Sequence, residues 1–515
     1  MAYVKPTNGN ANALTATSPR YAARRSTLIE SLCALAERVK SAKVKANNIR
    51  FIFIESLGFY LLDAKLNDFV ARSTEILQKN TKFVFKESKN NPKMKRIIST
   101  LVAVLTIGTL AAQLPASPFT VVACPDQNSS KNMNISWGVD TLSTATSVRY
   151  TRIGDSDWKR ARVVEAETHL CTTYDGISSK TPQGVTVNEQ VRFTKCEATL
   201  SGLRPDTDYK YSIGSGDEWS EERYFRTAGA KEWSVCAISD FHAYTPLPHR
   251  VNSAMEMIGT VEKYDPSIDW ILHLGDITAW GGSYSFWYDL YTRKPFHDYM
   301  WAGVNGNHDN MTRVNGQSNA FFRDANFYPR NGYGNEMGVC YYFYYGDALF
   351  IMLNSEVMRK AEGLAEAQAW VRNVVEQNKA RYVIVCEHYQ WFFGHDGKDS
   401  QYGRWCELFD ELGVDLALAG NNHIYVRTAP LYAGEATDGK RGTVYVQLPS
   451  SDNERGQAIK DMPKQNEDKI RCTWYEGPKT VGAIHIAANK KQLVLTLLDR
   501  NGNQIDRCEV LAKKK

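Results

Sequence analysis

The stretch Asp269–Asp276, DWILHLGD, is an apolar run that ends in a glycine and an aspartate. An apolar run of this length, bounded by glycine or a polar residue, predicts a buried strand. Comparable runs are WSVCAIS (233–239), ARYVIVCE (380–387) and VDLALAG (414–420). Five segments carry polar residues at such positions: Asp240-Phe241-His242, Gly275-Asp276, Gly306-Asn307-His308-Asp309, Glu387-His388 and Gly420-Asn421-Asn422-His423.

These five segments contain the residue types that bind two metal ions. Open α/β sheets bind ligands at the carboxyl ends of their strands, so the five polar ends are expected to meet there. A lone histidine at a strand end is usually a hydrogen-bonded structural residue, but five such ends in one chain predict a metal site. A mixed Asp, His and Asn shell suits Fe, Zn or Mn better than Ca or Mg, and it leaves those three open.

The order D-x-H, G-D, G-N-H-D, H and G-x-x-H over residues 233–450 resembles the metallophosphoesterase (calcineurin-like) superfamily. The resemblance implies an α/β fold, a two-sheet αββα sandwich. In that family one carboxylate bridges two metals, and Asp276 stands in its position. The resemblance further implies two ligand sets, which are Asp240, His242, Asp276 and His423 for the first metal, and Asp276, Asn307 and His388 for the second.

Two departures from the family pattern affect the expected metals. Purple acid phosphatases carry an iron-binding tyrosine three residues after the bridging aspartate, where this chain has Ala279, so a purple tyrosinate–iron enzyme is not expected. The last motif is usually G-H-x-H, whereas here Asn421 replaces the first histidine. An amide oxygen is a poorer donor than imidazole for these metals, so Asn421 is a doubtful ligand and the second metal site is expected to be weaker.

His308 and Asp309 are the expected catalytic residues. In the family the histidine of this segment lies near the leaving group, and Asn307 beside it takes the ligand role. Asp309 is expected to orient the imidazole of His308 and to raise its pKa, as a general acid near neutral pH requires. His395, in FFGHDGKDS, is a weaker candidate for a phosphate contact, with an exposed loop histidine as the alternative.

Residues 118–228 contain short strand-like runs separated by polar turns, which predict an all-β sandwich. The end of this segment, SGLRPDTDYKYSIGSGDEWSEERYFRT, resembles a fibronectin type III-like module. Such a module precedes the catalytic domain in purple-acid-phosphatase-like enzymes. The resemblance therefore places the chain near that branch, with an all-β sandwich at 113–228 and a catalytic domain at 229–515.

The segment 94–112 has the features of a secretory signal peptide. Met94-Lys95-Arg96 precedes the apolar run IISTLVAVLTIGTLAA, which is short for a membrane span of about 20 residues, although an uncleaved anchor is the alternative. Translation is therefore expected to start at Met94, with residues 1–93 as an upstream extension. The expected location is exported, either periplasmic or extracellular, without a stable membrane anchor.

The charge of the chain depends on that extension. Residues 1–96 hold 18 Lys and Arg against 7 Asp and Glu, a net charge of +11, while the whole chain has +5. Residues 97–515 therefore carry about −6, which argues against nucleic-acid binding. The oligomeric state is left open.

Helical spacing appears at 250–263, 361–378 and 402–412, and the tail from Val481 alternates as a closing antiparallel hairpin. Helices alternating with apolar strands indicate α/β layers. Nine of the ten cysteines follow Met94. Cys236 and Cys386 are expected to be reduced core residues, whereas Cys171 and Cys196 are the pair expected to form a disulfide.

These features together predict an exported, binuclear-metal phosphoesterase that acts on a small phosphoester. The favoured interpretation is phosphomonoester hydrolysis by a metal-bound hydroxide. Phosphodiester or nucleotide hydrolysis on the same fold is an alternative, and a metal-impaired binding protein, suggested by Asn421, is another.

Overall fold

The computed structural model describes residues 117–512 except 156–157, 176–188, 246, 280–283, 310–319, 393–399, 453–467 and 478. The predicted extension, the signal peptide and His395 lie outside the described residues. Residues 117–515 form one compact unit. The boundary expected between residues 228 and 229 stays a prediction, because one sheet runs through both parts.

That sheet has ten strands in the order β24-β23-β22-β10-β11-β12-β1-β2-β6-β5. Its centre is parallel, with β10 beside β11 and β11 beside β12. A parallel bridge between Ala123 and Met300 joins β1 to β12 and so connects the front strands to the catalytic ones. The bounds are β1 Phe119–Pro125, β2 Met133–Val139, β5 Glu167–Asp175, β6 Glu189–Leu200, β10 Trp233–Ile238, β11 Trp270–His273, β12 Met300–Gly303, β22 Gly482–Ala488, β23 Gln492–Asp499 and β24 Gln504–Leu511.

The second sheet has seven strands in the order β13-β14-β15-β16-β20-β17-β21. Strands β14, β15, β16 and β20 are parallel, so their carboxyl ends share one edge. The bounds are β13 Tyr341–Tyr345, β14 Ala348–Met352, β15 Tyr382–Cys386, β16 Leu416–Ala419, β17 Tyr425–Thr428, β20 Val444–Gln447 and β21 Ile470–Trp474, with β18 Leu431–Tyr432 and β19 Glu435–Ala436 as a separate pair.

The two sheets pack face to face through aromatic side chains. The ring of Trp270 on β11 lies 5.1 Å from that of Phe350 on β14, and Trp233 on β10 lies 5.7 Å from the same ring. Aromatic pairs at such distances add to the free energy gained from burial. Trp233 and Trp270 are the first residues of their strands, so these aromatic contacts join the two sheets at the end opposite the predicted ligands.

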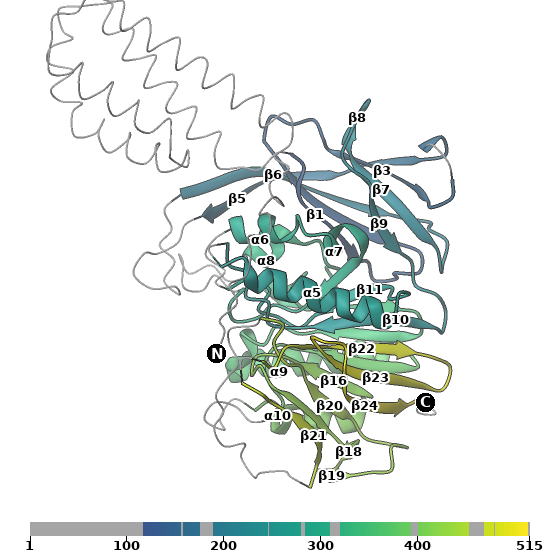
Figure 1. Ribbon diagram of the computed structural model, residues 1–515, viewed down its shortest axis with the longest axis vertical. Coiled ribbons are helices and arrows are strands. Elements are labelled where there is room, and N and C mark those ends of the chain that lie inside the picture. The colour runs from purple at the N-terminus through teal and green to yellow at the C-terminus, as the bar shows by residue number, and fades with distance from the viewer. Residues whose placement is uncertain are drawn as a thin grey trace, which may run out of the picture. The chain divides into compact units, whose positions relative to one another are not determined.

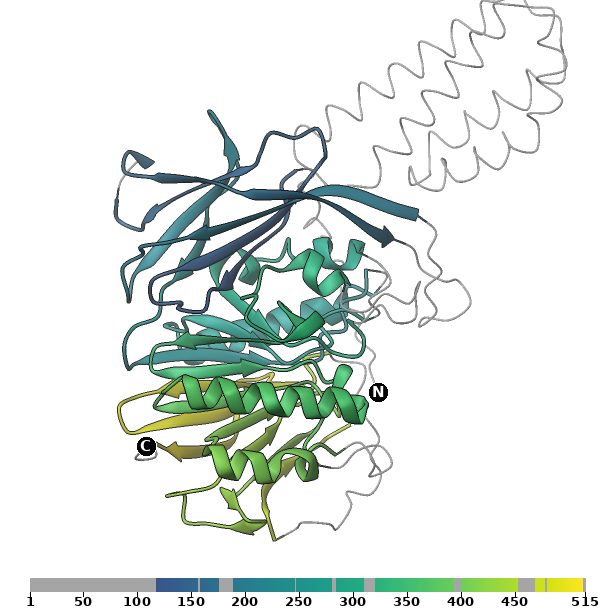
Figure 2. The same cartoon turned by 180° about the vertical axis from the view of Figure 1, so that it is seen from behind.

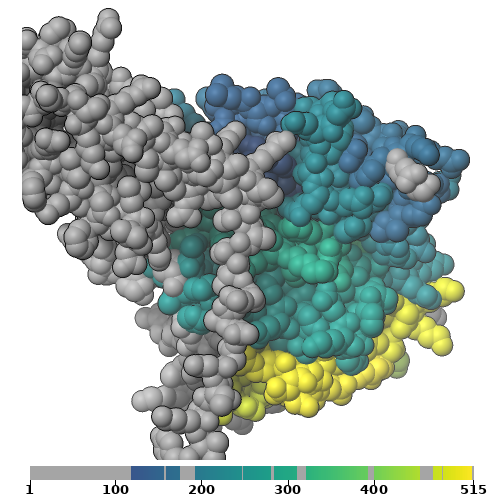
Figure 3. Space-filling view, turned by 45° about the horizontal axis from the view of Figure 1, so that its top comes forward, coloured from purple at the N-terminus to yellow at the C-terminus, as the bar shows by residue number. Residues whose placement is uncertain are grey.

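Helices cover the outer faces of both sheets (Figures 1 and 2). On the first sheet α5, His249–Tyr264, buries Val251, Ala254, Ile258 and Val261, an i, i+3, i+7, i+10 pattern that presents one apolar face. It packs against β10, β22 and β23, and the space-filling view shows the yellow C-terminal strands bordering the teal surface (Figure 3). The helix ends at Asp265, because the following proline disfavours helical geometry there.

On the second sheet α9, Ala361–Gln377, and α10, Tyr402–Leu412, form the outer layer. Gly413, with a φ of 65°, ends α10 in the left-handed conformation that glycine adopts readily. All three predicted long helices are confirmed within one residue at either end. The shorter helices are α6 Ser285–Leu290, α7 Pro295–Asp298, α8 Ala320–Ala325, η2 Gly334–Glu336 and η3 Val357–Arg359.

The front of the described chain is all β. A third sheet contains β3 Ser147–Arg152, β4 Arg162–Glu165, β7 Asp208–Ser215, β8 Glu218–Trp219 and β9 Arg223–Arg226. The fold class predicted from the sequence, a two-sheet αββα sandwich preceded by an all-β sandwich, is confirmed. The tail is also confirmed as antiparallel, since β22 pairs with β23 and β23 with β24.

The predicted disulfide between Cys171 and Cys196 is wrong, because both cysteines are free and buried. Strands β5 and β6 pair so that Cys196 lies opposite Thr168, while Cys171 lies opposite Phe193. An offset of three residues points the two side chains to opposite faces of the sheet. Cys236 and Cys386 are free and buried, as expected.

None of the helices in the described ranges is long and apolar enough to cross a membrane.

Candidate metal centre

Five strand ends meet at one edge of the two sheets. In the first sheet β10 leads to Asp240 and His242, β11 to Asp276, and β12 to Asn307 and His308. In the second sheet β15 leads to His388, and β16 leads to Asn421 and His423. Parallel strands end at a common edge, which explains how residues up to 183 positions apart in sequence become neighbours.

The backbone at these strand ends is strained. Nine non-glycine residues in the described part of the chain have positive φ, and five of them are Asp240, His242, Asp276, Asn421 and His423. Left-handed geometry is costly for residues with a Cβ and persists where the surrounding structure enforces it, most often at functional sites. Hydrogen bonds from Asp240 N to Gly275 O (3.1 Å) and from His242 N to Asp276 O (2.9 Å) hold two of these loops together.

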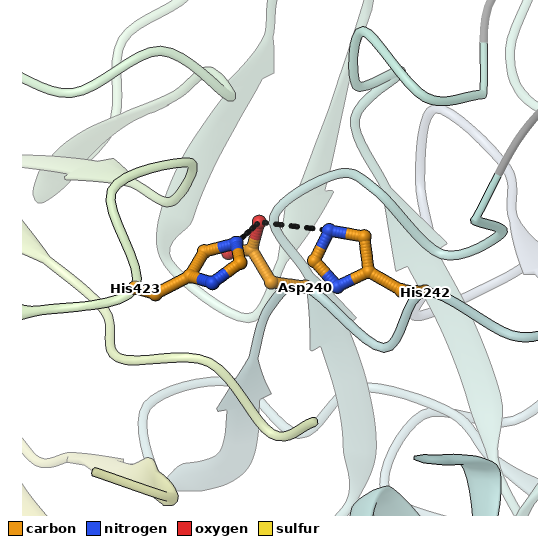
Figure 4. Close-up of side chains that lie close together, drawn as sticks. All are labelled: Asp240, His242 and His423. Atoms are coloured by element: carbon orange, nitrogen blue, oxygen red, sulfur yellow. Dashed lines mark ion pairs between the residues drawn. The ribbon is translucent and has the colours of Figure 1, made fainter. Parts of the chain in front are cut away.

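The first group consists of Asp240, His242 and His423, all buried (Figure 4). Asp240 Oδ1 lies 3.3 Å from His423 Nε2 and 4.0 Å from His242 Nε2. Oδ2 of the same carboxylate accepts hydrogen bonds from Ser239 Oγ (2.6 Å) and Asn421 N (3.2 Å). The carboxylate is therefore fixed by one oxygen, and its other oxygen faces the two imidazoles.

Asp276 lies between the two sets of histidines. Its Oδ1 is 3.2 Å from His388 Nε2, and its Oδ2 is 3.4 Å from His242 Nε2. The carboxylate thus presents one oxygen to each side. Glycines make this approach possible, since a Cβ on Gly275 would lie 2.3 Å from His388 Nδ1.

The donor atoms around His388 test whether a metal ion fits. Its Nδ1 lies 2.7 Å from Leu274 O, so Nδ1 carries the proton and donates to this carbonyl. In the neutral ring Nε2 then holds a lone pair, yet it faces two more acceptors, Asp276 Oδ1 and Asn307 Oδ1, each at 3.2 Å. Three acceptors that converge in a buried place need a shared positive charge, which a proton on Nε2 supplies in the metal-free protein and a divalent ion supplies when it displaces that proton. The residues fit a metal.

The charges of the site residues also favour a bound cation. Burial alone raises the pKa of the Asp240 carboxyl, but the imidazoles of His423 and His388 outweigh burial and hold it at about 2. Burial lowers the pKa of His388, and the carboxylates of Asp276 and Asp240 reverse this and raise it to about 10. Each carboxylate is therefore stabilised as an anion by positive charge close to it.

His308 is buried beside this group, and its Nε2 lies 3.7 Å from Asp276 Oδ2. Its Nδ1 is hydrogen-bonded to Ala279 O, so the backbone carbonyl at the position of the missing tyrosine orients the imidazole. His308, His242 and Asp276 also form a group close enough to hold an ion. The geometry thus permits either a proton-donor or a ligand role for His308.

The carboxylate of Asp309 contacts the backbone of the loop that carries Asp276. Asp309 Oδ2 accepts hydrogen bonds from Gly306 N (3.0 Å) and Ile277 N (3.3 Å), and Oδ1 accepts one from Thr278 N (2.9 Å). The carboxylate points at the backbone of the loop after Asp276, because that loop has amide groups without strand partners. Asp309 therefore braces the loop that carries Asp276, and its expected role in orienting the imidazole of His308 stays a prediction.

Asn421 lies at the site, but its side-chain Nδ2 donates a hydrogen bond to Gln390 Oε1. Gln390 is buried and was not anticipated from the sequence. The amide of Asn421 is thus engaged by a second amide where the family pattern has a ligand imidazole.

Asp452 is the other site residue that the sequence analysis missed. It is buried, and its Oδ2 lies 3.4 Å from His242 Nδ1. The signal was present, since PSSD (449–452) follows the apolar strand β20 as the other site residues follow theirs.

Comparison with known families gives two matches. Residues 118–227 match the family described as purple acid phosphatase, N-terminal domain, and residues 234–425 match the family described as calcineurin-like phosphoesterase. The second match begins in β10 and ends in β17, and it contains every predicted metal ligand.

Individual relatives are distant. Two uncharacterized proteins of Mycobacterium tuberculosis are 26% identical over 352 residues, which cover 61% of this chain and 62% of theirs, so the chain spans less than two thirds of these relatives. The structure of a purple acid phosphatase from yellow lupin (Lupinus luteus) seeds is similar with a TM-score of 0.60 and 16% identity, covering 78% of this chain and 75% of the lupin chain. At that identity the likeness concerns the fold.

Proposed function

Because this chain belongs to the metallophosphoesterase (calcineurin-like) superfamily, with the N-terminal domain of its purple-acid-phosphatase-like branch, we propose that it hydrolyses phosphomonoesters with two divalent metal ions. The observation that carries the proposal is the placement of Asp276, whose two carboxylate oxygens face His388 on one side and His242 on the other. A carboxylate in this position can share its oxygens between two ions, which is the requirement of a binuclear site.

The chain offers two ligand sets for these ions. Asp240, His242, Asp276 and His423 would hold the first, and Asp276, Asn307 and His388 would hold the second. Bound Fe, Zn or Mn ions would supply Lewis acidity, lower the pKa of a water molecule and offset charge on the phosphoryl oxygens. With Ala279 in place of the tyrosine, no tyrosinate–iron colour is expected.

The protein's own residues then orient the reactants. His308, whose Nδ1 is held by Ala279 O, would donate the Nε2 proton of its imidazolium form to the leaving oxygen. Asp309 keeps the Asp276 loop in place through its backbone hydrogen bonds. The substrate is a small phosphoester, and the apolar segment after Met94 supports export without a stable membrane anchor.

The engagement of Asn421 by Gln390 favours a second candidate function. With one ligand replaced by an amide, a protein that binds phosphoesters at a single-metal site without fast turnover is the alternative. Diester and nucleotide hydrolysis are variants of the first proposal on the same residues.

One experiment separates these functions. Protein made from Gln113 onward is analysed for metal content and assayed on a panel of phosphomonoesters, phosphodiesters and nucleotides, with Asp276→Asn as the control. We expect monoester hydrolysis that depends on metal and is lost in the control. A protein that binds metal but turns over none of the panel supports the binding function, and one that binds no metal contradicts both.

A further inference from the structure

The segment Ser450–Asp452 lies against the loop that carries Asp240 and His242. Ser450 Oγ lies 3.0 Å from Asp240 O, and Ser451 donates to Ser239 O through both N (3.0 Å) and Oγ (2.8 Å). Asp452 N in turn donates to Ser450 Oγ at 3.0 Å. All three residues are buried, so a segment about 210 positions away in sequence is fixed behind the first ligand loop.

We propose that Asp452 is a positioning residue that holds His242 ready to bind the first metal ion. Its Oδ2 lies 3.4 Å from His242 Nδ1, while Nε2 of the same ring faces Asp276. With its proton on Nδ1, at ion-pair distance from the Asp452 carboxylate, the ring leaves the lone pair of Nε2 for the metal. The inference rests on the metal centre proposed above.

Three histidines of the metal centre have described Nδ1 contacts, and these contacts differ in kind. Nδ1 of His388 and Nδ1 of His308 meet neutral backbone carbonyls, those of Leu274 and Ala279. Nδ1 of His242 meets a carboxylate. Carboxylate–histidine–metal arrangements make the imidazole a stronger donor, and loss of the outer carboxylate costs about 10–100-fold in metal affinity.

Asp452 also lies close to an arginine side chain. Arg250 Nε, at the start of α5, lies 3.6 Å from the same Oδ2 that faces His242. A guanidinium and an imidazole thus flank the same carboxylate oxygen. Behind the ring of His242 lies a carboxylate, whereas the described partner behind the ring of His388 is a carbonyl. The two sites should differ in affinity, with the first the tighter.

The test measures metal binding directly on the full chain. Asp452→Asn keeps the shape of the side chain and removes its charge, and Ser451→Ala is the matched control, since it removes a neighbouring brace of the same segment without altering charge. The metal-free proteins are titrated with Zn²⁺ against a chromophoric chelator, and the Co²⁺ forms are recorded by visible absorption. We expect Asp452→Asn to weaken the tighter site about 10–100-fold and to shift its Co²⁺ bands, with the weaker site within about threefold of wild type.

The control separates positioning from packing. Ser451→Ala should leave both affinities and the Co²⁺ spectrum near wild type. If Asp452→Asn binds both ions as wild type does, or if the two variants lose affinity equally, the positioning role of Asp452 is wrong while the metal centre stands. If wild type itself binds no Zn²⁺, the proposed function has failed instead.

Discussion

The side-chain amide of Asn421 donates a hydrogen bond to the side-chain carbonyl of Gln390, at the position where related enzymes place a metal-binding imidazole. In the proposed centre this pair would leave the second ion with Asp276, Asn307 and His388, whereas the first would have four protein ligands and the carboxylate of Asp452 behind it. The two sites are therefore expected to differ in metal affinity. The difference can be tested by changing residues at either site.

Replacing Asn421 with histidine should strengthen the second site. Imidazole is a better donor than an amide for Zn or Mn, and we expect an affinity gain on the order of 10–100-fold, the scale of ligand-shell changes. Histidine tolerates the left-handed backbone at this position (φ 72°) better than most residues do. Wild type as purified should hold closer to one tight ion than two and should be activated by added Mn or Zn.

Metal content by atomic emission and activity against added metal check this prediction. Asn421→Gln, which has similar bulk without an imidazole, serves as the control and should not gain occupancy. Tight binding of two ions by wild type, unchanged in Asn421→His, would show that the substitution is harmless.

His308→Ala should lower kcat by about 10²–10⁴-fold on substrates with poor leaving groups, since a general acid contributes on this scale. With nitrophenyl phosphate the loss should be smaller, because a nitrophenolate needs little protonation. Metal content should stay constant if His308 donates a proton and should fall if it is a ligand. Equal losses on both substrates, or loss of an ion, would contradict the proton-donor role.

The convergence of the proposed ligands could be predicted from the sequence because each lies within a few residues of the end of an apolar strand, and the topology of parallel strands brings such ends together. The partners of those ligands could not be predicted in the same way. Asp309 was assigned to its neighbour His308, but its carboxylate satisfies amide groups of a loop some 30 residues earlier. Gln390 and Asp452 act on residues 31 and 210 positions away, a distance that no local pattern reports.

In the fold, too, local features could be predicted from the sequence and contacts between distant segments could not. Strand-forming runs predicted the front sandwich, and helical spacing predicted α5, α9 and α10, because these signals are local. The pairing of β1 with β12 was not predictable, since it depends on which sheet edge a strand of ordinary composition meets. The prediction of a disulfide between Cys171 and Cys196 was wrong for the same reason, because a correct prediction requires the register of β5 against β6.

Gly306→Ala should abolish metal binding at the bridging carboxylate. A Cβ at residue 306 would lie 2.2 Å from both N and Oδ1 of Asp276, a distance at which something must shift. We expect metal content and activity to be lost together, by more than tenfold. Gly403→Ala in α10, where a Cβ meets nothing within 4 Å, is the control and should stabilise the fold by about 0.5–1 kcal/mol. A Gly306→Ala protein with full metal content would contradict this prediction, because it would show that the loop containing residue 306 can shift away from Asp276 without loss of metal binding.

The exported protein should begin near Gln113, with translation starting at Met94. The apolar run that follows Lys95-Arg96 has the length and the small-residue end of a signal peptide. N-terminal sequencing of protein recovered outside the cytoplasm checks both points. Recovery of chains that still carry residues 1–93 would rule out this start.

Asp506→Asn should destabilise the fold at neutral pH, because Asp506 on β24 ties the C-terminal hairpin to β17. Its Oδ1 accepts from Arg427 Nη2 at 2.9 Å, and its Oδ2 accepts from Arg427 Nε (2.5 Å) and Tyr425 Oη (2.7 Å). Burial raises the pKa of the Asp506 carboxyl, but the hydrogen bonds from Arg427 and Tyr425 outweigh it, so the pKa lies below its ordinary value. Removing the charge leaves a partly buried guanidinium without its carboxylate, which costs about 1–3 kcal/mol.

The sign of the pH dependence follows from that lowered pKa. A carboxyl with a lower pKa in the folded state contributes its stability above its unfolded pKa of about 3.9 and loses it as pH falls through the folded value. The difference in Tm between wild type and Asp506→Asn should therefore be full at pH 7 and shrink below about pH 4. Glu509→Gln, in the exposed pair with Arg507, is the matched control and should change stability by less than about 1 kcal/mol. A Tm difference that persists unchanged at pH 2 would show that the charge of Asp506 is not what holds the hairpin.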